Sequence, residues 1–270
     1  TGHVCGRCPA CERGDYLLCS EKVNLGLGYG YSGGFTKYCR IPGEILAIHK
    51  RAIWEIPEGL EYEEAAVMDP ICNAYKAIAQ RSGLLPGENV VIFGTGPLGL
   101  FSVQIAKIMG ALNIVVVGLE EDVKVRFGVA RQLGATEVVN GSAEDVVQRC
   151  QEICGGSDSI GLVVDCAGAN ICLKQAIEMV RCNGEIVRVG MGFKPVGFSI
   201  NDISMKAVSI IGHMAYDATS WRNALQLLAA GRIQVKPMIT HRLGLSRWEE
   251  GFEAMANKEA IKVILTYDFD

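Results

Sequence analysis

From residue 73 onward, short β-branched runs alternate with amphipathic segments, and this alternation limits the fold more than any other feature. The runs "NVVIF" and "NIVVV" are continuously apolar, as expected of strands that are covered on both faces. Between them, apolar residues recur at spacings of three or four, which marks one face of a helix: Leu98, Phe101, Ile105 and Ile108. Strand–helix alternation of this kind predicts an α/β fold with a parallel, doubly wound sheet.

The same patterns predict the remaining elements. Strands are expected at 89–93, 113–117, 136–140, 160–168, 185–191, 208–214 and 261–268. Helices are expected at 73–83, 98–108, 123–134, 143–154, 169–184, 220–233 and 247–260, with Gly184 as a C-cap of the fifth. The first seventy residues are rich in glycine, proline and cysteine, and "KYCRI" (37–41) and "ILAIH" (45–49) have a β-like composition.

A G-x-G-x-x-G pattern, "GTGPLG", lies between the first strand and the first long helix of this region. In that context Gly94 makes the tight turn, Gly96 lets the backbone approach a pyrophosphate, and Gly99 lets the helix pack closely on the sheet. The helix N-terminus would then face the phosphate charge. The pattern therefore predicts a dinucleotide site, although a glycine-rich connection that binds nothing is the alternative.

The second strand of such a fold usually ends in an acid that binds the ribose hydroxyls. Gly118 occupies that position, and Glu120, Glu121 and Asp122 follow it. Carboxylates at this place would repel the 2′-phosphate of NADP, so the sequence favours NAD. The same acids could instead stabilise the N-terminus of the next helix, where negative charge is favourable.

Four cysteines open the chain with the spacing C-x2-C-x2-C-x7-C: Cys5, Cys8, Cys11 and Cys19. Four thiolates complete a tetrahedral zinc shell and leave no position for water or substrate, so a zinc here is expected to be structural. His3 lies beside the cluster, but the four cysteines already fill the shell. Disulfides are the alternative, and the close spacing disfavours them.

Composition excludes several classes of function. The chain has 270 residues, a net charge of −4 and no dense lysine or arginine run, which argues against a nucleic-acid partner. No apolar run reaches the roughly 18 residues of a membrane span. The 11 cysteines form no disulfide framework, so we expect buried free thiols and a cytoplasmic location.

The two motifs, in this order, resemble those of the zinc-dependent medium-chain alcohol and polyol dehydrogenases, especially the sorbitol and threonine 3-dehydrogenase branch. The segments that match in order are "CGRCPACERGDYLLC", "GGFTKY", "EEAAVMDP", "VIFGTGPLGL", "DCAGAN", "GEIVRVGMG" and "AIKVIL". The resemblance implies three parts. These are part of a β-rich GroES-like catalytic domain with the zinc lobe (1–72), an NAD(P)-binding Rossmann domain (73–214) and a return to the catalytic domain (215–270).

The resemblance also implies where the cofactor binds. Gly94, Gly96, Leu98 and Gly99 match the pyrophosphate turn of the family. Gly118 departs from the family pattern, and Glu120 or Glu121 is expected to substitute for the missing acid. Further matching positions are Arg126 near the adenosine ribose, and Val189, Gly190, Met191, His213 and Met214 along the nicotinamide side.

The resemblance implies a catalytic zinc only in a full-length enzyme. Family members bind that metal with a cysteine and a histidine that lie upstream of the zinc lobe, so roughly the first quarter of the family's layout is expected to be absent before Thr1. The third position is Asp69, which would lie in the zinc shell, as in sorbitol-type members, or assist proton relay, as in threonine-type members. Alternatively, Asp69 is the N-cap of a helix that has Pro70 as its first residue.

We therefore expect an NAD-dependent enzyme that oxidises a secondary alcohol, such as a polyol or L-threonine, to a ketone. It is expected to act on small molecules and to form a homo-oligomer, a dimer or tetramer. This chain alone is expected to bind NAD and one structural zinc but to turn over poorly. The alternatives are a catalytically incompetent remnant of such an enzyme, a zinc-ribbon interaction module, and a zinc-free quinone reductase of the same superfamily.

Overall fold

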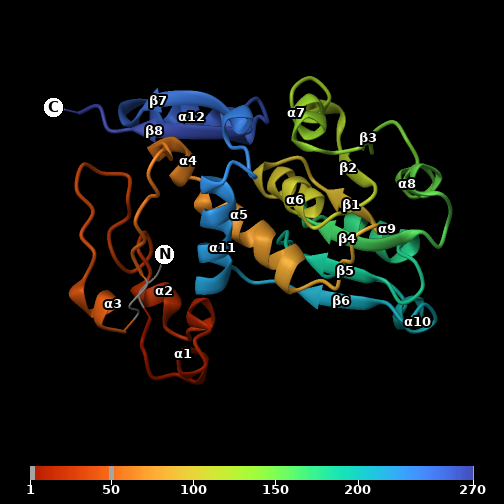
Figure 1. The fold of residues 1–270 in the computed structure, drawn as a ribbon, viewed down its shortest axis with the longest axis horizontal. Coiled ribbons are helices and arrows are strands. Elements are labelled where there is room, and N and C mark those ends of the chain that lie inside the picture. Colours follow the sequence, from red (N-terminus) through yellow and green to blue (C-terminus); the bar gives the residue numbers. More distant parts are fainter. Residues whose placement is uncertain (1–3, 49–51, 270) are drawn as a thin grey trace.

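A computed structural model describes residues 4–48 and 52–269 and contains a six-stranded parallel sheet (Figure 1). The spatial order of the strands is β3-β2-β1-β4-β5-β6. Their bounds are β1 (Asn89–Phe93), β2 (Ile114–Gly118), β3 (Glu137–Asn140), β4 (Ile160–Asp165), β5 (Glu185–Arg188) and β6 (Ser209–Gly212). The order reverses between β1 and β4, so the predicted doubly wound Rossmann fold is confirmed.

Helices cover both faces of this sheet. One face carries α5 (Met68–Tyr75), α6 (Pro97–Ile108), α7 (Arg126–Leu133) and α11 (Ala218–Ala229), and the other carries α8 (Val146–Cys154) and α9 (Asn170–Met179). Alternate residues of β1 enter the two cores: Val90 and Ile92 face the α6 layer, whereas Val91 and Phe93 face the α8 layer. Successive strand residues point to opposite faces, which explains why the run is apolar throughout.

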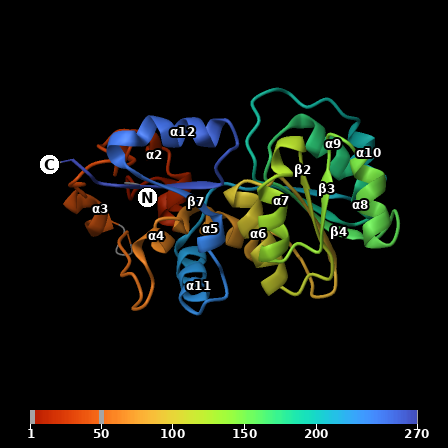
Figure 2. The same ribbon diagram turned by 90° about the horizontal axis from the view of Figure 1, so that it is seen from above.

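A second group of elements lies beside the parallel sheet. Strands β7 (Ile239–Gly244) and β8 (Lys262–Thr266) form a two-stranded parallel sheet, against which α12 (Trp248–Ala256) packs. Figures 1 and 2 both show these elements, together with the cysteine-bearing N-terminal segment, on the side away from α8 and α9. The short helical elements are α1 (Pro9–Glu12), η1 (Tyr16–Leu18), α2 (Lys22–Leu25), α3 (Gly43–Ile48), α4 (Tyr62–Ala65), η2 (Lys76–Gln80), η3 (Glu120–Asp122), α10 (Ile200–Ser204), η4 (Lys236–Met238) and η5 (Leu245–Arg247).

Three expected elements differ from the structure. Residues 37–41 form no strand, and most of the run at 45–49 belongs to helix α3. A β-like run becomes a strand only when it finds a partner strand, and none pairs with these runs among the described residues. The helix expected over 169–184 ends at Met179, because Val180 turns extended to bury its side chain and the Arg181 N–H bonds to the Ile160 carbonyl.

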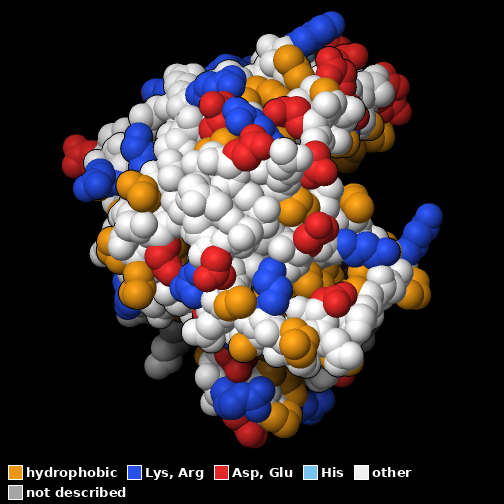
Figure 3. Space-filling view, turned by 90° about the vertical axis from the view of Figure 1, so that its right-hand side faces the viewer, with side chains coloured by type: hydrophobic (Ala, Val, Ile, Leu, Met, Phe, Trp, Pro, Cys, Tyr) orange, Lys and Arg blue, Asp and Glu red, His pale blue; other side chains and the backbone are white. Residues whose placement is uncertain are grey.

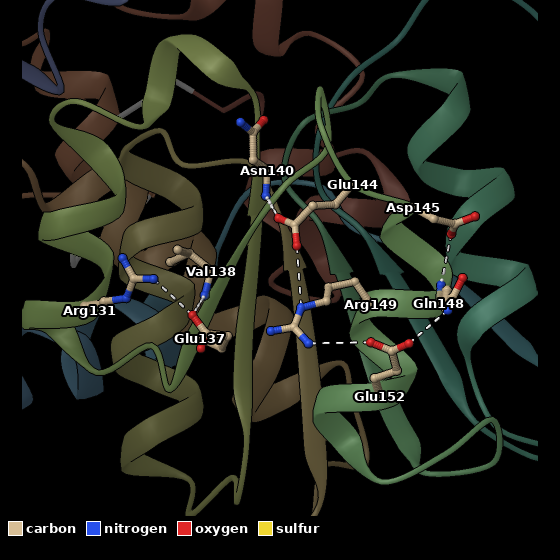
Figure 4. A network of polar contacts seen from close by, with 9 residues as sticks. All are labelled: Arg131, Glu137, Val138, Asn140, Glu144, Asp145, Gln148, Arg149 and Glu152. Carbon is tan, nitrogen blue, oxygen red and sulfur yellow. Dashed lines mark hydrogen bonds and ion pairs between the residues drawn. The ribbon is translucent and has the colours of Figure 1, made fainter.

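Ion pairs cover the outer edge beside β3 and α8 (Figure 4). Arg149 lies 3.4 Å from Glu144 and 3.5 Å from Glu152, and Asp145 caps α8 by accepting the Gln148 N–H at 3.0 Å. Exposed pairs of this kind contribute only about 0.2–1 kcal/mol each. On the face shown in Figure 3, acidic and basic side chains are interspersed. Among the described helices, none has the length and apolar character that crossing a bilayer requires.

Candidate functional site

The glycine turn joins β1 to α6 at the carboxyl edge of the sheet. Gly94 adopts a φ of +102°, which favours glycine, and a Cβ on Gly99 would overlap the Gly94 carbonyl oxygen. Gly96 is the N-cap of α6, and a Cβ there would meet nothing within 4 Å. Pro97 begins the helix, and no side chain caps its free N–H groups. The turn therefore offers backbone donors, including the Leu98 N–H, beside open space.

The end of β2 is closed to any side chain at position 118. A Cβ on Gly118 would lie 2.5 Å from Phe127, 2.8 Å from Thr95 and 2.9 Å from the Asp122 carboxylate. The carboxylate that approaches this position therefore belongs to Asp122, which accepts the Leu119 N–H at 2.8 Å.

The neighbouring charges are paired. The buried Arg126 guanidinium lies 3.2 Å from Asp122 and donates to the Ala260 carbonyl at 2.8 Å. Glu121 pairs with Lys258 at 2.6 Å, and Lys258 lowers the pKa of that carboxyl. The exposed Glu120 accepts a hydrogen bond from Asn140 at 2.6 Å. Arg126 thus faces the protein interior, whereas Glu120 lies at the surface beside the strand ends.

Two loops follow β4 and β5 at the same edge. Val189 and Gly190 both donate to the Asp165 carbonyl oxygen, at 2.9 and 2.7 Å. Gly94 belongs to the same cluster, because a Cβ on it would lie 3.3 Å from the Ala167 nitrogen. Met191, which follows Gly190, is largely exposed. The turn after β1 and the loops after β4 and β5 therefore meet at the point where the strand order reverses.

A hydrogen-bond chain connects Asp69 with the end of β6. Asn73 donates to the Asp69 carboxylate at 3.1 Å, and the Tyr216 hydroxyl donates to its other oxygen at 2.9 Å. The Asn73 Oδ1 lies 3.1 Å from the Nε2 of His213, which follows β6 directly. Asp69 is not the N-cap that the sequence allowed, because α5 begins one residue earlier, at Met68.

The partners of His213 determine its protonation. Asn73 presents an acceptor to Nε2, so that nitrogen carries the proton and Nδ1 is an acceptor. Nδ1 is buried and has no hydrogen-bond partner among the described residues. Burial, with the nearby charges of Lys76 and Arg81, lowers the pKa of His213 to about 4. The ring is therefore neutral at pH 7, and the exposed Met214 follows it.

The four cysteines form a metal-binding arrangement. All four sulfurs lie within 4.8 Å of one another, with Cys8 to Cys11 at 3.5 Å and Cys5 to Cys11 at 4.0 Å. A tetrahedron with zinc–sulfur bonds of about 2.3 Å has sulfur–sulfur edges of about 3.8 Å, so the thiols fit zinc closely. Backbone hydrogen bonding at Cys11 lowers the pKa of Cys8 to about 6, and the Cys5 N–H donates to the Cys19 sulfur at 3.4 Å.

The cysteine lobe, residues 4–19, is distant from the glycine turn in both ribbon views (Figures 1 and 2). It has a small apolar cluster of its own, built from Val4, Cys11 and Cys19. Among the described residues the four cysteines are the only group of three or more potential metal ligands, and His3 lies outside those residues.

Several polar residues at this edge were not predicted from the sequence. Asn73 and Tyr216 gave no signal, because their partners are distant in the chain. Asp165 did carry a signal, since it is a charged residue that ends an otherwise apolar strand, and Arg188 ends the short strand "EIVR". Asp122 is one of three consecutive acids, and nothing in the sequence marks it as the buried one.

Comparison with known proteins decides the family. Residues 97–230 match the zinc-binding dehydrogenase family model. The chain is 72% identical over 271 residues to the uncharacterised zinc-type alcohol dehydrogenase-like protein YdjL of Escherichia coli K12, covering 100% of this chain and 75% of that protein. It is 32% identical to sorbitol dehydrogenase of Halalkalibacterium halodurans, covering 98% of this chain and 74% of that enzyme.

The chain belongs to the zinc-binding dehydrogenases. Like the family's alcohol and polyol dehydrogenases, it is an oxidoreductase, as the sequence predicted.

Solved structures of other dehydrogenases share the fold. Alcohol dehydrogenase TADH from Thermus sp. ATN1 superposes with a TM-score of 0.87 at 29% identity, covering 99% of this chain and 75% of that one. A zinc-binding dehydrogenase of Sinorhizobium meliloti, solved with NADP, superposes with a TM-score of 0.83 at 27% identity. The match covers 98% of this chain and 74% of that one. An E. coli alcohol dehydrogenase, solved with NADH, superposes with a TM-score of 0.84 at 25% identity. The match covers 98% of this chain and 75% of that one.

Proposed function

We propose that this zinc-binding dehydrogenase transfers a hydride between a secondary alcohol, of the polyol or amino alcohol class, and NAD. The observation that carries the proposal is the glycine turn, which leaves open space at Gly96 in front of uncapped helix donors. A pyrophosphate bound there would meet the backbone N–H groups and the positive end of the helix dipole. The bound nicotinamide supplies the hydride acceptor.

The dinucleotide would cross the carboxyl edge at the reversal between β1 and β4. Its pyrophosphate would lie against Gly94, Gly96, Leu98 and Gly99, and its adenosine half would lie toward Gly118. Its nicotinamide half would lie toward Val189, Gly190, Met191, His213 and Met214.

The surroundings of β2 support NAD over NADP. The guanidinium of Arg126 is buried against Asp122 and Ala260, so it is not free to receive a 2′-phosphate. Lys258 is paired with Glu121, and the exposed carboxylate of Glu120 would repel added negative charge. A ribose with two free hydroxyls suits this environment better, because hydroxyls can donate to a carboxylate.

NAD⁺ is expected to bind at least about tenfold more tightly than NADP⁺, which is the effect of about 1.4 kcal/mol of repulsion and lost hydrogen bonding. Calorimetric titration of this chain measures both Kd values. Titration with ADP and with 2′,5′-ADP is the matched control, because it isolates the adenosine half. Equal or tighter binding of NADP⁺ would contradict the choice of NAD. Binding of neither dinucleotide would overturn the proposed function.

Asp69 is the residue we assign to the chemistry. Asn73 and Tyr216 hold its two oxygens through neutral hydrogen bonds, and no ion pair to it occurs among the described residues. The carboxylate is therefore held in a fixed direction. We propose that it assists transfer of the alcohol proton, and that it would orient a water at a catalytic zinc if that metal were bound. A catalytic zinc, when bound, would act as a Lewis acid.

One observation favours a second candidate function, a protein that binds NAD and zinc without turnover. The described residues bring no second set of metal ligands together around Asp69. We expect this chain alone to oxidise sorbitol or L-threonine far more slowly than a zinc-dependent relative, by at least about a hundredfold, because the alkoxide would lack its Lewis acid. NADH absorbance in the presence of zinc measures the rate. A rate comparable to that of sorbitol dehydrogenase would exclude this second function.

Two further proposals concern the oligomeric state and the cellular location of the protein. Strand β6 is the outer strand of the sheet and exposes Ile210, which supports pairing with a second copy in a homo-oligomer. Light scattering measures the molar mass. No disulfide joins any of the eleven cysteines, all of which lie within the described residues, and this supports a reducing, cytoplasmic location.

A further inference from the structure

Two glycine-rich loops at the carboxyl edge touch each other directly through their backbones. They are residues 166–169, after β4, and residues 189–192, after β5. A Cβ on Gly190 would overlap the Gly168 nitrogen, and a Cβ on Gly168 would lie 2.6 Å from the Met191 carbonyl oxygen. Gly168 also has a φ of +78°. No side chain separates the loops, so their spacing depends on what anchors each one.

Asp165 anchors both loops from the end of β4. Its side chain is fully buried, and its Oδ1 accepts the N–H groups of Ala167 at 3.0 Å and Gly168 at 2.8 Å. Its backbone carbonyl accepts from Val189 and Gly190 in the other loop. One residue therefore binds the start of each loop, but its second carboxylate oxygen still requires a partner.

Arg188 at the end of β5 is that partner. Its Nη1 forms an ion pair with Oδ2 of Asp165, and its Nη2 donates to the Gly168 carbonyl oxygen at 2.6 Å. The guanidinium thus connects the strand that precedes one loop to the backbone of the other. Because its donors are held in a rigid fork, both contacts are fixed together.

The ion pair is not needed for the sheet itself. Backbone pairing already sets Asp165 opposite Arg188, as it does along the rest of β4 and β5. Replacing a buried ion pair by apolar residues is often neutral for stability, because charges are costly to desolvate. What an apolar pair could not supply is the contact to the Gly168 carbonyl and the fixed position of the two loops.

We propose that Arg188 and Asp165 are positioning residues that set the spacing of the two loops for the nicotinamide half of NAD. The inference rests on the proposed function, because it assumes that NAD binds at this edge. The adenosine half, beside β2, would be independent of the pair, since the nearest groups to a Cβ on Gly118 belong to Phe127, Thr95 and Asp122, which lie outside both loops. The proposal therefore predicts a loss of affinity that is confined to one half of the cofactor.

The test compares Kd values for NAD⁺ and for ADP, which lacks the nicotinamide half, by calorimetry. Arg188→Met is expected to raise the Kd for NAD⁺ at least about tenfold, which is the effect of losing one charged hydrogen bond. The Kd for ADP should stay within about twofold of the wild-type value. Arg188→Lys keeps the charge but cannot hold both contacts, so an intermediate loss is expected. Asp165→Asn combined with Arg188→Met leaves no unpaired buried charge and should fold even if the single variant does not.

Arg181→Met is the matched control. Arg181 pairs with Glu88 at 2.8 Å and donates to the Cys182 carbonyl. It lies at the opposite edge of the sheet from the two loops, because its backbone N–H bonds to Ile160 at the start of β4. This variant should bind both ligands as the wild type does. Unchanged NAD⁺ binding in all Arg188 variants, or an equal loss of ADP binding, would overturn the inference. A wild-type chain that does not bind NAD⁺ would overturn the proposed function and this inference with it.

Discussion

Cys11→Ser is expected to release the zinc and unfold the cysteine lobe, while the parallel sheet keeps its affinity for NAD. Cys11 lies at the centre of the cluster, near both Cys5 and Cys8, so its loss removes one ligand and disorders two others. The apolar cluster of the lobe is too small to fold without metal, because the binding free energy of a structural zinc is folding free energy.

Zinc content and trypsin cleavage measure this effect. Mass spectrometry should find about one zinc per wild-type chain and almost none in the variant. Cleavage after Arg13, which is exposed in the lobe, should accelerate at least about tenfold, because the lobe samples open states more often. The Kd for NAD⁺ should change less than about threefold, since the buried cluster of the lobe is separate from the main core, against which the partly buried Leu17 of the lobe packs.

Cys182→Ser is the control, because Cys182 is exposed and lies outside the lobe. It should retain full zinc content and wild-type resistance to trypsin. Full zinc content in Cys11→Ser would exclude the four-thiolate site. A parallel loss of NAD affinity would mean that the metal supports the cofactor site directly, and its role would then not be confined to the lobe.

The sequence predicted the parallel sheet because its signals are local. A run such as "NVVIF" must be buried on both faces wherever it lies, and a glycine turn after such a run has few alternatives. The spacing of the four cysteines is similarly local, and the structure brings their sulfurs together. Each of these predictions rests on residues that are close in the chain.

The sequence could not predict contacts that depend on the assembled fold. Tyr216 binds Asp69 across 147 residues, and His213 meets Asn73 across 140. The strand predicted over 45–49 was wrong for the same reason, because a strand needs a partner whose position the local sequence does not encode. The departure at Gly118 was visible in the sequence, but its cause, the crowding by Phe127, was not.

Gly96→Ala and Gly99→Ala should separate cofactor binding from packing within a single turn. A Cβ at position 96 meets nothing within 4 Å, so Gly96→Ala should leave the melting temperature unchanged. The added methyl group would occupy the space through which the pyrophosphate approaches, and NAD⁺ affinity should fall at least about tenfold through weakened hydrogen bonds to the phosphates. A Cβ at position 99 would overlap the Gly94 carbonyl, so Gly99→Ala must push α6 away from β1.

Gly99→Ala should therefore lose both stability and binding. Overpacking of this kind costs about 1–3 kcal/mol, which corresponds to a decrease in Tm of about 2–5 °C for a chain of this length. Gly128→Ala, on α7 with open space around it, is the matched control and should equal or exceed wild-type stability. Calorimetric titration and thermal unfolding of the three variants measure both properties. If Gly96→Ala bound NAD⁺ as tightly as the wild type, the phosphates could not pass over Gly96, and the glycine turn would be a packing feature alone.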